Sequence, residues 1–366
     1  MRIALLTYST RPRGGVVHTL ALAEALVELG HDVDVWSLAR GGDAGFFRPV
    51  DPAVGVRLVP FPEVEGESVG TRILRSIDVL GTAFAAVGHD YDVVHAQDCI
   101  SANAAPRCVR TIHHLDTFTT PELAACHERA VVTPYAHVCV SHAVAAEVRA
   151  GWGIAATVIP NGVDAARFAG VAAADRDRRR AELGRYVLAV GGIEPRKGSA
   201  DLVEAMAHAR RRDPGLRLVV AGGETLFDYR DYRAAVLARA AALDVEPVLL
   251  GPVAHDALPS YVAGATAFAF PSVKEGFGMA ALEAMAAGVP VVMRDLPVLR
   301  EVFAGAATFA AGPHDLAAGL LAAARGPDAE RVGRGRALAE RHTWRAAASA
   351  HADLYAALCQ PTAPHL

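Results

Sequence analysis

Short apolar runs alternate with longer segments of helical periodicity along most of the chain. In the first half these runs predict β-strands at residues 2–8, 32–38, 56–61, 92–96, 109–113, 138–141 and 158–159. Residues 17–29 repeat apolar side chains at helical spacing, and Gly30 follows as the glycine that ends a helix. Such alternation predicts a parallel sheet that is covered by helices on both faces.

A segment without strand character, residues 164–184, separates this half from a second alternating half. It is rich in alanine, arginine and aspartate, which predicts a helix with a charged face in solvent. Five further strands are predicted at residues 186–191, 216–221, 247–250, 267–270 and 289–293, with helices at 200–211 and 280–287. We therefore expect two doubly wound α/β domains, with ligands in a central cleft at the carboxyl ends of their strands.

Composition and charge exclude several classes of protein. The 366 residues include 36 Lys plus Arg and 40 Asp plus Glu, and this net charge of −4 argues against general nucleic-acid binding. No apolar run reaches the roughly 18 residues of a transmembrane helix. The beginning of the chain lacks the long apolar stretch of a secretory signal, and the five cysteines are scattered without C-x-x-C spacing. These features predict a cytoplasmic protein with reduced thiols and no zinc site.

Two glycine turns precede predicted helices and are candidate anion sites. Gly14 and Gly15 follow the first strand, and residues 191–198 follow the first strand of the second half. Close backbone approach and free amides at a helix N-terminus suit a phosphate group. The second turn also carries Arg196 and Lys197, which lie at the helix pole that disfavours cations. The alternatives are a structural glycine turn and ordinary solvated charges.

Residues 270–290 are the most informative segment. A strand ends at Pro271, a Gly-x-Gly turn leads into a helix, and Glu275 and Glu283 lie eight positions apart. A carboxylate on an otherwise apolar helix is costly to bury without hydrogen-bond donors, and sugar hydroxyls are suitable donors. In the alternative interpretation, Glu283 faces solvent and Glu275 caps the helix.

The pattern E-x7-E, within E-G-F-G-M-x-x-L-E-A-M-A-x-G-x-P-V, resembles the signature of retaining GT-B glycosyltransferases of family 4. The Gly14–Gly15 turn, residues 158–164 and the basic turn at 191–198 are similar to other segments of that family, in the same order. Trp344 and the helix that follows resemble its carboxyl-terminal helix. The resemblance implies an acceptor-side Rossmann-like domain over residues 1–165 plus 345–366, to which that helix crosses back, and a Rossmann-like donor domain over residues 166–344.

The resemblance also implies roles for individual residues. Glu283 would bind the ribose of a nucleoside diphosphate sugar, Glu275 the transferred sugar, and Lys197 with the Gly15 amide the diphosphate. His113, at the end of a strand, matches the active-site histidine of the family, although His114 is an alternative. The catalytic residues implied are His113, Lys197 and Glu275. The donor-binding residues implied are Gly14, Gly15, Gly192, Arg196, Lys197, Glu275, Gly276, Phe277, Gly278, Met279 and Glu283.

One position departs from the family pattern. The family usually has an arginine where this chain has Gly192, and we expect Arg196 to replace its charge. GT-B enzymes generally need no metal, so none is expected. Asp90 and Asp92 look like a metal-binding D-x-D, but they precede a strand and so belong at the opposite end of the sheet.

The resemblance implies transfer of a sugar, with UDP-sugar as the expected donor, to an acceptor that the sequence does not identify. The alternatives are a nucleotide-sugar epimerase, a sugar-phosphate synthase and a non-catalytic nucleotide-sugar binding protein. Residues 71–87 are amphipathic, but Arg72 and Arg75 are too few for a membrane-binding face. A packed helix is therefore expected there, and peripheral membrane contact is not favoured.

Overall fold

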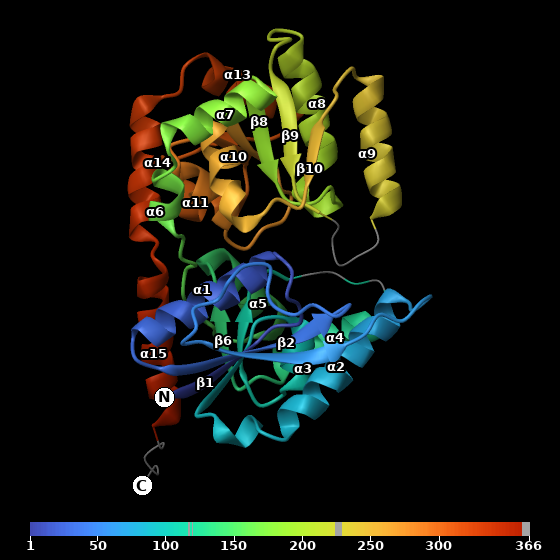
Figure 1. Ribbon diagram of the computed structural model, residues 1–366, viewed down its shortest axis with the longest axis vertical. Coiled ribbons are helices and arrows are strands. Elements are labelled where there is room, and N and C mark those ends of the chain that lie inside the picture. The colour runs from blue at the N-terminus through green and yellow to red at the C-terminus, as the bar shows by residue number, and fades with distance from the viewer. Residues whose placement is uncertain (116–117, 119, 224–228, 361–366) are drawn as a thin grey trace. The chain divides into compact units, whose positions relative to one another are not determined.

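The structure is a computed structural model that describes residues 1–115, 118, 120–223 and 229–360. The chain forms two compact units (Figure 1). Unit 1 contains Met1–Gly162 and Trp344–Leu366, and unit 2 contains Val163–Thr343. Each unit is built around one parallel sheet.

The sheet of unit 1 has seven strands in the order β3-β2-β1-β4-β5-β6-β7. Their bounds are β1 Arg2–Leu6, β2 Asp32–Arg40, β3 Gly55–Phe61, β4 Val93–Ala96, β5 Val109–Ile112, β6 Ala136–Cys139 and β7 Thr157–Val158. The helices are α1 Gly14–Glu28, α2 Val69–Ala85, α3 Cys99–Ala104, α4 Pro121–Val132, α5 His142–Trp152 and α15 Trp344–Cys359, with the 3₁₀ turn η1 Gly88–Asp90. β2 and β3 lie on one side of β1, whereas β4 to β7 lie on its other side. The strand order therefore reverses between β1 and β4, and we call this position the switch point of the sheet.

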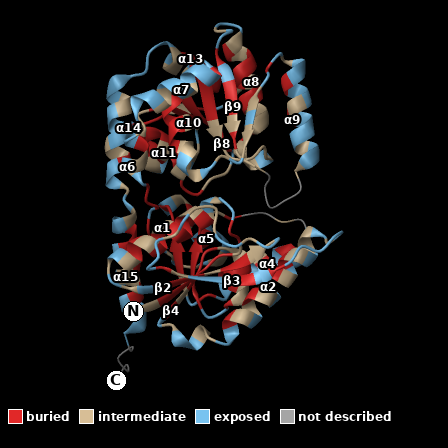
Figure 2. Ribbon diagram, viewed as in Figure 1, coloured by how far each residue is buried: buried red, intermediate tan, exposed pale blue. Residues whose placement is uncertain are grey.

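Both faces of β1 are buried, which explains its uninterrupted apolar run. Ile3 and Leu5 pack with α1 and α15, whereas Ala4 and Leu6 pack against Phe84 of α2. Buried positions line the strands of both sheets (Figure 2). A strand that is buried on both faces is apolar at nearly every position and does not alternate apolar with polar residues.

The sheet of unit 2 has six strands in the order β10-β9-β8-β11-β12-β13. Their bounds are β8 Tyr186–Val190, β9 Arg217–Ala221, β10 Val248–Gly251, β11 Ala267–Phe270, β12 Val291–Arg294 and β13 Thr308–Ala310. The helices are α6 Ala165–Ala169, α7 Ala173–Leu183, α8 Ser199–Arg210, α9 Arg230–Ala242, α10 Leu258–Gly264, α11 Met279–Ala286, α12 Pro297–Phe303, α13 Pro313–Arg325 and α14 Ala329–Arg341, with the 3₁₀ turns η2 Pro195–Lys197 and η3 His255–Ala257. The switch point of this sheet lies between β8 and β11.

The two-sheet α/β architecture predicted from the sequence is confirmed, with two local differences. The sequence analysis missed β13, which has only three residues. Residues 164–184 form helices, but their charged face is not wholly solvated, because the Arg179 guanidinium lies 3.9 Å from the ring centroid of Tyr261. Gly30 has φ +87°, as expected for a helix-ending glycine. In the described residues no helix is both long and apolar enough to span a membrane.

Two further sequence expectations concern the first unit. Residues 71–87 fall on α2, which buries Ile73, Ser76, Leu80 and Phe84 and is thus a packed helix. The D-x-D lies where strands begin, since Asp92 accepts a 2.7 Å hydrogen bond from the backbone N–H of Arg2. The expected placement at the amino end of the sheet is confirmed.

The contact between Tyr355 of α15 and β4 gives a test of how α15 is held. The Tyr355 hydroxyl lies 2.5 Å from Nδ1 of the buried His95, whose Nε2 is 2.7 Å from Thr111. Tyr355→Phe leaves the His95 nitrogen unpaired and is expected to lower the free energy of unfolding of unit 1 by about 1–2 kcal/mol. Urea unfolding combined with hydrogen exchange of β4 and α15 measures this. Tyr135→Phe is the control, because Tyr135 is half exposed; equal effects of the two variants would contradict the assignment.

Candidate functional site

Two loops meet at the switch point of unit 2. One follows β8 and contains η2, and the other follows β11 and leads to α11. Lys197 of the first loop and Glu275 of the second form an ion pair, with 2.6 Å between Nζ and Oε1. Arg196 Nη1 lies 3.3 Å from the same carboxylate oxygen, and its Nη2 is 3.1 Å from Glu194. The site therefore holds two cations around one carboxylate that is only 11% exposed.

Glycines let the two loops approach each other. Gly198 has φ +65°, and a Cβ there would lie 2.2 Å from the carbonyl oxygen of Pro271. Gly278 has φ +109° and is the N-cap residue of α11, just as Gly198 is that of α8. The first backbone N–H groups of both helices thus follow the loops directly, where they can bind an anion.

Glu283 lies in the middle of α11 and, unlike Glu275, is not paired with a cation among the described residues. In the described part of the chain, no hydrogen bond or ion pair involves its half-buried carboxylate. Burial raises its pKa to about 7, against a lowering by the positive charge of Arg167 and a further raising by Asp164. A ligand that donates hydrogen bonds to the ionised carboxylate would stabilise a partly buried group of this kind.

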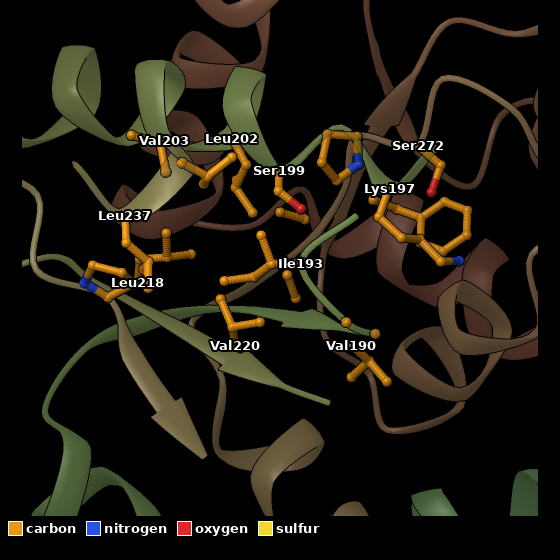
Figure 3. A pocket seen from close by; sticks show the side chains of 18 residues that line it. Val190, Ile193, Lys197, Ser199, Leu202, Val203, Leu218, Val220, Leu237 and Ser272 are labelled. Atoms are coloured by element: carbon orange, nitrogen blue, oxygen red, sulfur yellow. The ribbon is translucent and has the colours of Figure 1, made fainter. Parts of the chain in front are cut away.

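A pocket extends from the Lys197 loop beneath α8 (Figure 3). Lys197 and Ser272 lie at one end of it, and aliphatic side chains such as Leu202, Leu218 and Leu237 line the other. The hydroxyl of Ser272 is buried and has no hydrogen-bond partner in the described part of the chain. Only the end with Lys197 has the polar groups that a phosphate needs.

The switch point of unit 1 brings a glycine turn close to a histidine. Gly14 and Gly15 begin α1, and a Cβ added at Gly15 would lie 3.8 Å from the ring of His113, which follows β5. The His18 ring of α1 packs edge-on against His113 at 4.8 Å between centroids. His18 Nδ1 is in turn 2.9 Å from Oδ1 of Asn161.

Burial keeps these histidines neutral. It lowers the pKa of His113 well below 6.5, and the nearby Arg110 and His114 lower it further. The pKa of His18 is also lowered well below 6.5, by burial and then by His113 and His351. Nε2 of His113 is buried without a hydrogen-bond partner among the residues that the structure describes. A neutral imidazole with a free ring nitrogen can donate or accept one hydrogen bond, depending on its tautomer.

The structure places the residues singled out by sequence in two groups. Unit 2 contains Gly192, Arg196, Lys197, Glu275, Gly276, Phe277, Gly278, Met279 and Glu283, and unit 1 contains Gly14, Gly15 and His113. Sequence reasoning missed Glu194, Ser272, His18 and Asn161. The only signal for Glu194 was its position two residues before Arg196, and nothing marked the pairing of His18 with Asn161, 143 residues away. Among the described residues no three His, Cys, Asp or Glu side chains form a cluster suited to a metal ion.

Comparison with known proteins gives matches along most of the chain. Residues 173–331 match the family model "Glycosyl transferases group 1", and residues 12–167 match "Glycosyltransferase Family 4". Phosphatidyl-myo-inositol mannosyltransferase of Mycolicibacterium smegmatis is 31% identical over 88% of this chain and 83% of that protein. The chain belongs to glycosyltransferase family 4. The protein is thus a glycosyltransferase of the GT-B type.

Other similar proteins agree with this assignment. Glycogen synthase of Mycobacterium tuberculosis is 30% identical over 98% of this chain and 95% of its own length. Among solved structures, sucrose-phosphate synthase of Thermosynechococcus elongatus has a TM-score of 0.79 at 20% identity, with 98% of each chain covered. Anabaena HepE in complex with UDP-glucose has a TM-score of 0.77 at 18% identity, with 98% of this glycosyltransferase and 100% of HepE covered. These structures show the fold.

The raised pKa of Glu283 predicts how the stability of this glycosyltransferase depends on pH. Its ordinary pKa is 4.5 and its folded-state pKa is about 7, so the folded protein loses stability as pH rises between these values. Glu283→Gln removes this loss and is expected to be more stable than the wild type at pH 8 by about 1–2 kcal/mol, a value reduced for partial solvent access. The advantage should vanish near pH 4.

Urea unfolding at a series of pH values measures the difference. Glu340→Gln is the matched control, because Glu340 is exposed on α14, and it should follow the wild type at every pH. Parallel curves for Glu283→Gln and the wild type would show that the folded state does not perturb this carboxyl group.

Proposed function

We propose that this glycosyltransferase moves a sugar from a nucleoside diphosphate sugar, UDP-sugar foremost, to an acceptor with retention of anomeric configuration. The observation that carries the proposal is the cluster of Lys197 and Arg196 around Glu275 at the switch point of unit 2. Two cations beside two helix N-termini are suited to a diphosphate. The complexes of HepE with UDP and with UDP-glucose support the choice of UDP.

We assign the groups of the donor to residues of unit 2. The diphosphate would contact Lys197, Arg196 and the backbone of Gly192, with Arg196 replacing the arginine that the family usually has at that position. Glu283 would accept hydrogen bonds from the ribose hydroxyls, which fits a carboxylate that has no partner among the described residues. Glu275 and the turn at residues 276–279 would bind the transferred sugar.

The chemistry would be mainly electrostatic. The bond between the anomeric carbon and the diphosphate oxygen breaks, and the same face of the carbon bonds to the acceptor oxygen. The acceptor proton moves to the departing phosphate oxygen. Lys197, Arg196 and the amides at the start of α8 and α11 stabilise the charge on that leaving group, which is where fixed charges have the largest effect. No metal is required in this scheme, because these residues supply the positive charge.

His113 and Gly15 are the contributions of unit 1 in this proposal. A neutral His113 can hydrogen-bond a sugar hydroxyl through the nitrogen that has no protein partner. Its ring is held by His18, which Asn161 positions in turn. We assign the acceptor to unit 1 as well.

Lys197→Ala tests the charge-stabilisation step. It is expected to lower kcat by about 100- to 1,000-fold, because a fixed cation at the leaving group is lost. Release of UDP from UDP-glucose in the presence of an acceptor extract measures turnover. Lys274→Ala is the control: it removes the other lysine of the chain, from the loop that contains Glu275. Full turnover by Lys197→Ala would refute the proposed role.

Product analysis distinguishes the proposal from the alternatives. With UDP-glucose labelled in the sugar, transfer yields UDP and a labelled conjugate, and the proton coupling at its anomeric carbon reports retention. An epimerase would leave the sugar on the nucleotide, and a binding protein would bind UDP-glucose without turnover. An inverted product would contradict the retaining mechanism while leaving the transferase activity intact.

A further inference from the structure

Two arginines of unit 1 lie at the carboxyl ends of neighbouring strands without an acidic partner. Arg13 is the N-cap residue of α1, in the turn after β1, and Arg40 is the last residue of β2. Within the described residues, no carboxylate oxygen is within 4.0 Å of either guanidinium. Nε of each is buried and has no hydrogen-bond partner. Partly burying a cation without a counter-charge lowers the stability of the fold, so the presence of these two arginines at this edge needs an explanation.

Nearby arginines show how the fold treats a cation that serves structure. Arg75 of α2 forms two hydrogen bonds to Glu67, at 2.7 and 2.8 Å. Arg48 likewise forms two hydrogen bonds to Glu24, at 2.6 and 2.7 Å. Arg13 and Arg40 differ from both, because neither has a carboxylate partner among the described residues.

Aromatic rings hold Arg40 in place without using its donors. Its guanidinium carbon lies 5.2 Å from the ring centroid of Tyr8 and 5.4 Å from that of Phe61. Among the described residues, Arg40 donates a hydrogen bond to the Ser76 hydroxyl of α2, at 3.3 Å. A guanidinium has five N–H donors, so most of those of Arg40 have no protein partner among the described residues.

The acidic side chain beside Tyr8 forms hydrogen bonds with backbone groups rather than ion pairs with these arginines. Asp98 accepts a 2.9 Å hydrogen bond from the backbone N–H of Tyr8 and a 2.8 Å bond from that of Ser101, in the cap of α3. Both carboxylate oxygens are thus occupied by backbone groups. Burial lowers the pKa of Arg40, and the charges of Arg72 and Arg13 add to this effect, whereas Tyr8 and Asp98 oppose it. The positive charges of this edge therefore repel one another.

We propose that Arg13 and Arg40, beside the ring of Tyr8, bind a phosphate ester on the acceptor substrate. Two guanidinium groups can match the charge and the several oxygens of a phosphate, which a single carboxylate fits less well. The ester belongs either to a free sugar phosphate or to a lipid headgroup. This inference rests on the proposed transferase function, since it names the class of acceptor.

The first test separates this site from the donor site. Binding of inorganic phosphate and of UDP is measured by calorimetry at low salt for the wild type, Arg13→Gln, Arg40→Gln and Lys197→Ala. Each arginine variant is expected to weaken phosphate binding about tenfold or more and to leave UDP binding unchanged. Lys197→Ala should weaken UDP binding and retain phosphate binding. Arg107→Gln is the matched control, because it removes an exposed positive charge from the same unit.

Each outcome has a distinct meaning. Unchanged phosphate binding in both arginine variants overturns the phosphate site and leaves the proposed function standing. Unchanged UDP binding in Lys197→Ala overturns the donor assignment and leaves the phosphate site standing. Should Arg40→Gln fail to fold, Arg40→Lys keeps the charge but not the planar fork, and it should weaken phosphate binding less than Arg13→Gln does.

The second test identifies the source of the phosphate. Glucose 6-phosphate, glucose, glucuronate and vesicles containing phosphatidylglycerol are compared as probes with the wild type and Arg40→Gln. Binding of glucose 6-phosphate that exceeds that of glucose and is lost in Arg40→Gln supports a free sugar phosphate. The same loss with vesicles alone supports a lipid headgroup. Preference for glucuronate over glucose 6-phosphate overturns the phosphate assignment.

Discussion

The ion pair between Lys197 and Glu275 joins two loops that follow neighbouring strands although the residues are 78 positions apart. Its 2.6 Å length depends on Gly198, since any side chain there would meet the carbonyl of Pro271. The parallel sheet thus places both loops at one edge, and Gly198 lets their backbones come close together. Lys197 is already held in position and partly removed from bulk water. It can therefore bind a diphosphate with little reorganisation, and such preorganised charges are effective in catalysis.

Several polar groups near these edges lack the partners that buried groups ordinarily have. The carboxylate of Glu283 and the hydroxyl of Ser272 are examples in unit 2, and Nε2 of His113 is one in unit 1. Elsewhere His95 is satisfied by its contacts with Tyr355 and Thr111, although among the described residues Nε2 of His351 and the hydroxyl of Ser37 also lack a partner. Unsatisfied groups that gather where strands end are expected when function, rather than stability, determines the residue.

The sequence predicted the strands well because a buried parallel strand is an apolar run with few competing interpretations. It missed β13, since a three-residue strand has no measurable period. Glu275 and Lys197 could be singled out from motifs, but their contact could not, because local patterns do not encode which loops share an edge. The contact of His18 with Asn161 was hidden for the same reason. The charge run in residues 164–184 predicted a helix face in solvent, but the Arg179 guanidinium stacks on the Tyr261 ring.

The two candidate sites differ in whether a carboxylate contacts their cations, and the difference has a chemical meaning. Lys197 and Arg196 rest against Glu275, so their charge is partly neutralised until a stronger anion competes for it. That arrangement suits a group whose negative charge grows as the reaction proceeds, because stabilisation then increases towards the transition state. Among the described residues, no carboxylate contacts Arg13 or Arg40. A site of that kind favours a ligand that arrives fully charged and stays so, which contributes to binding and orientation rather than to bond breaking.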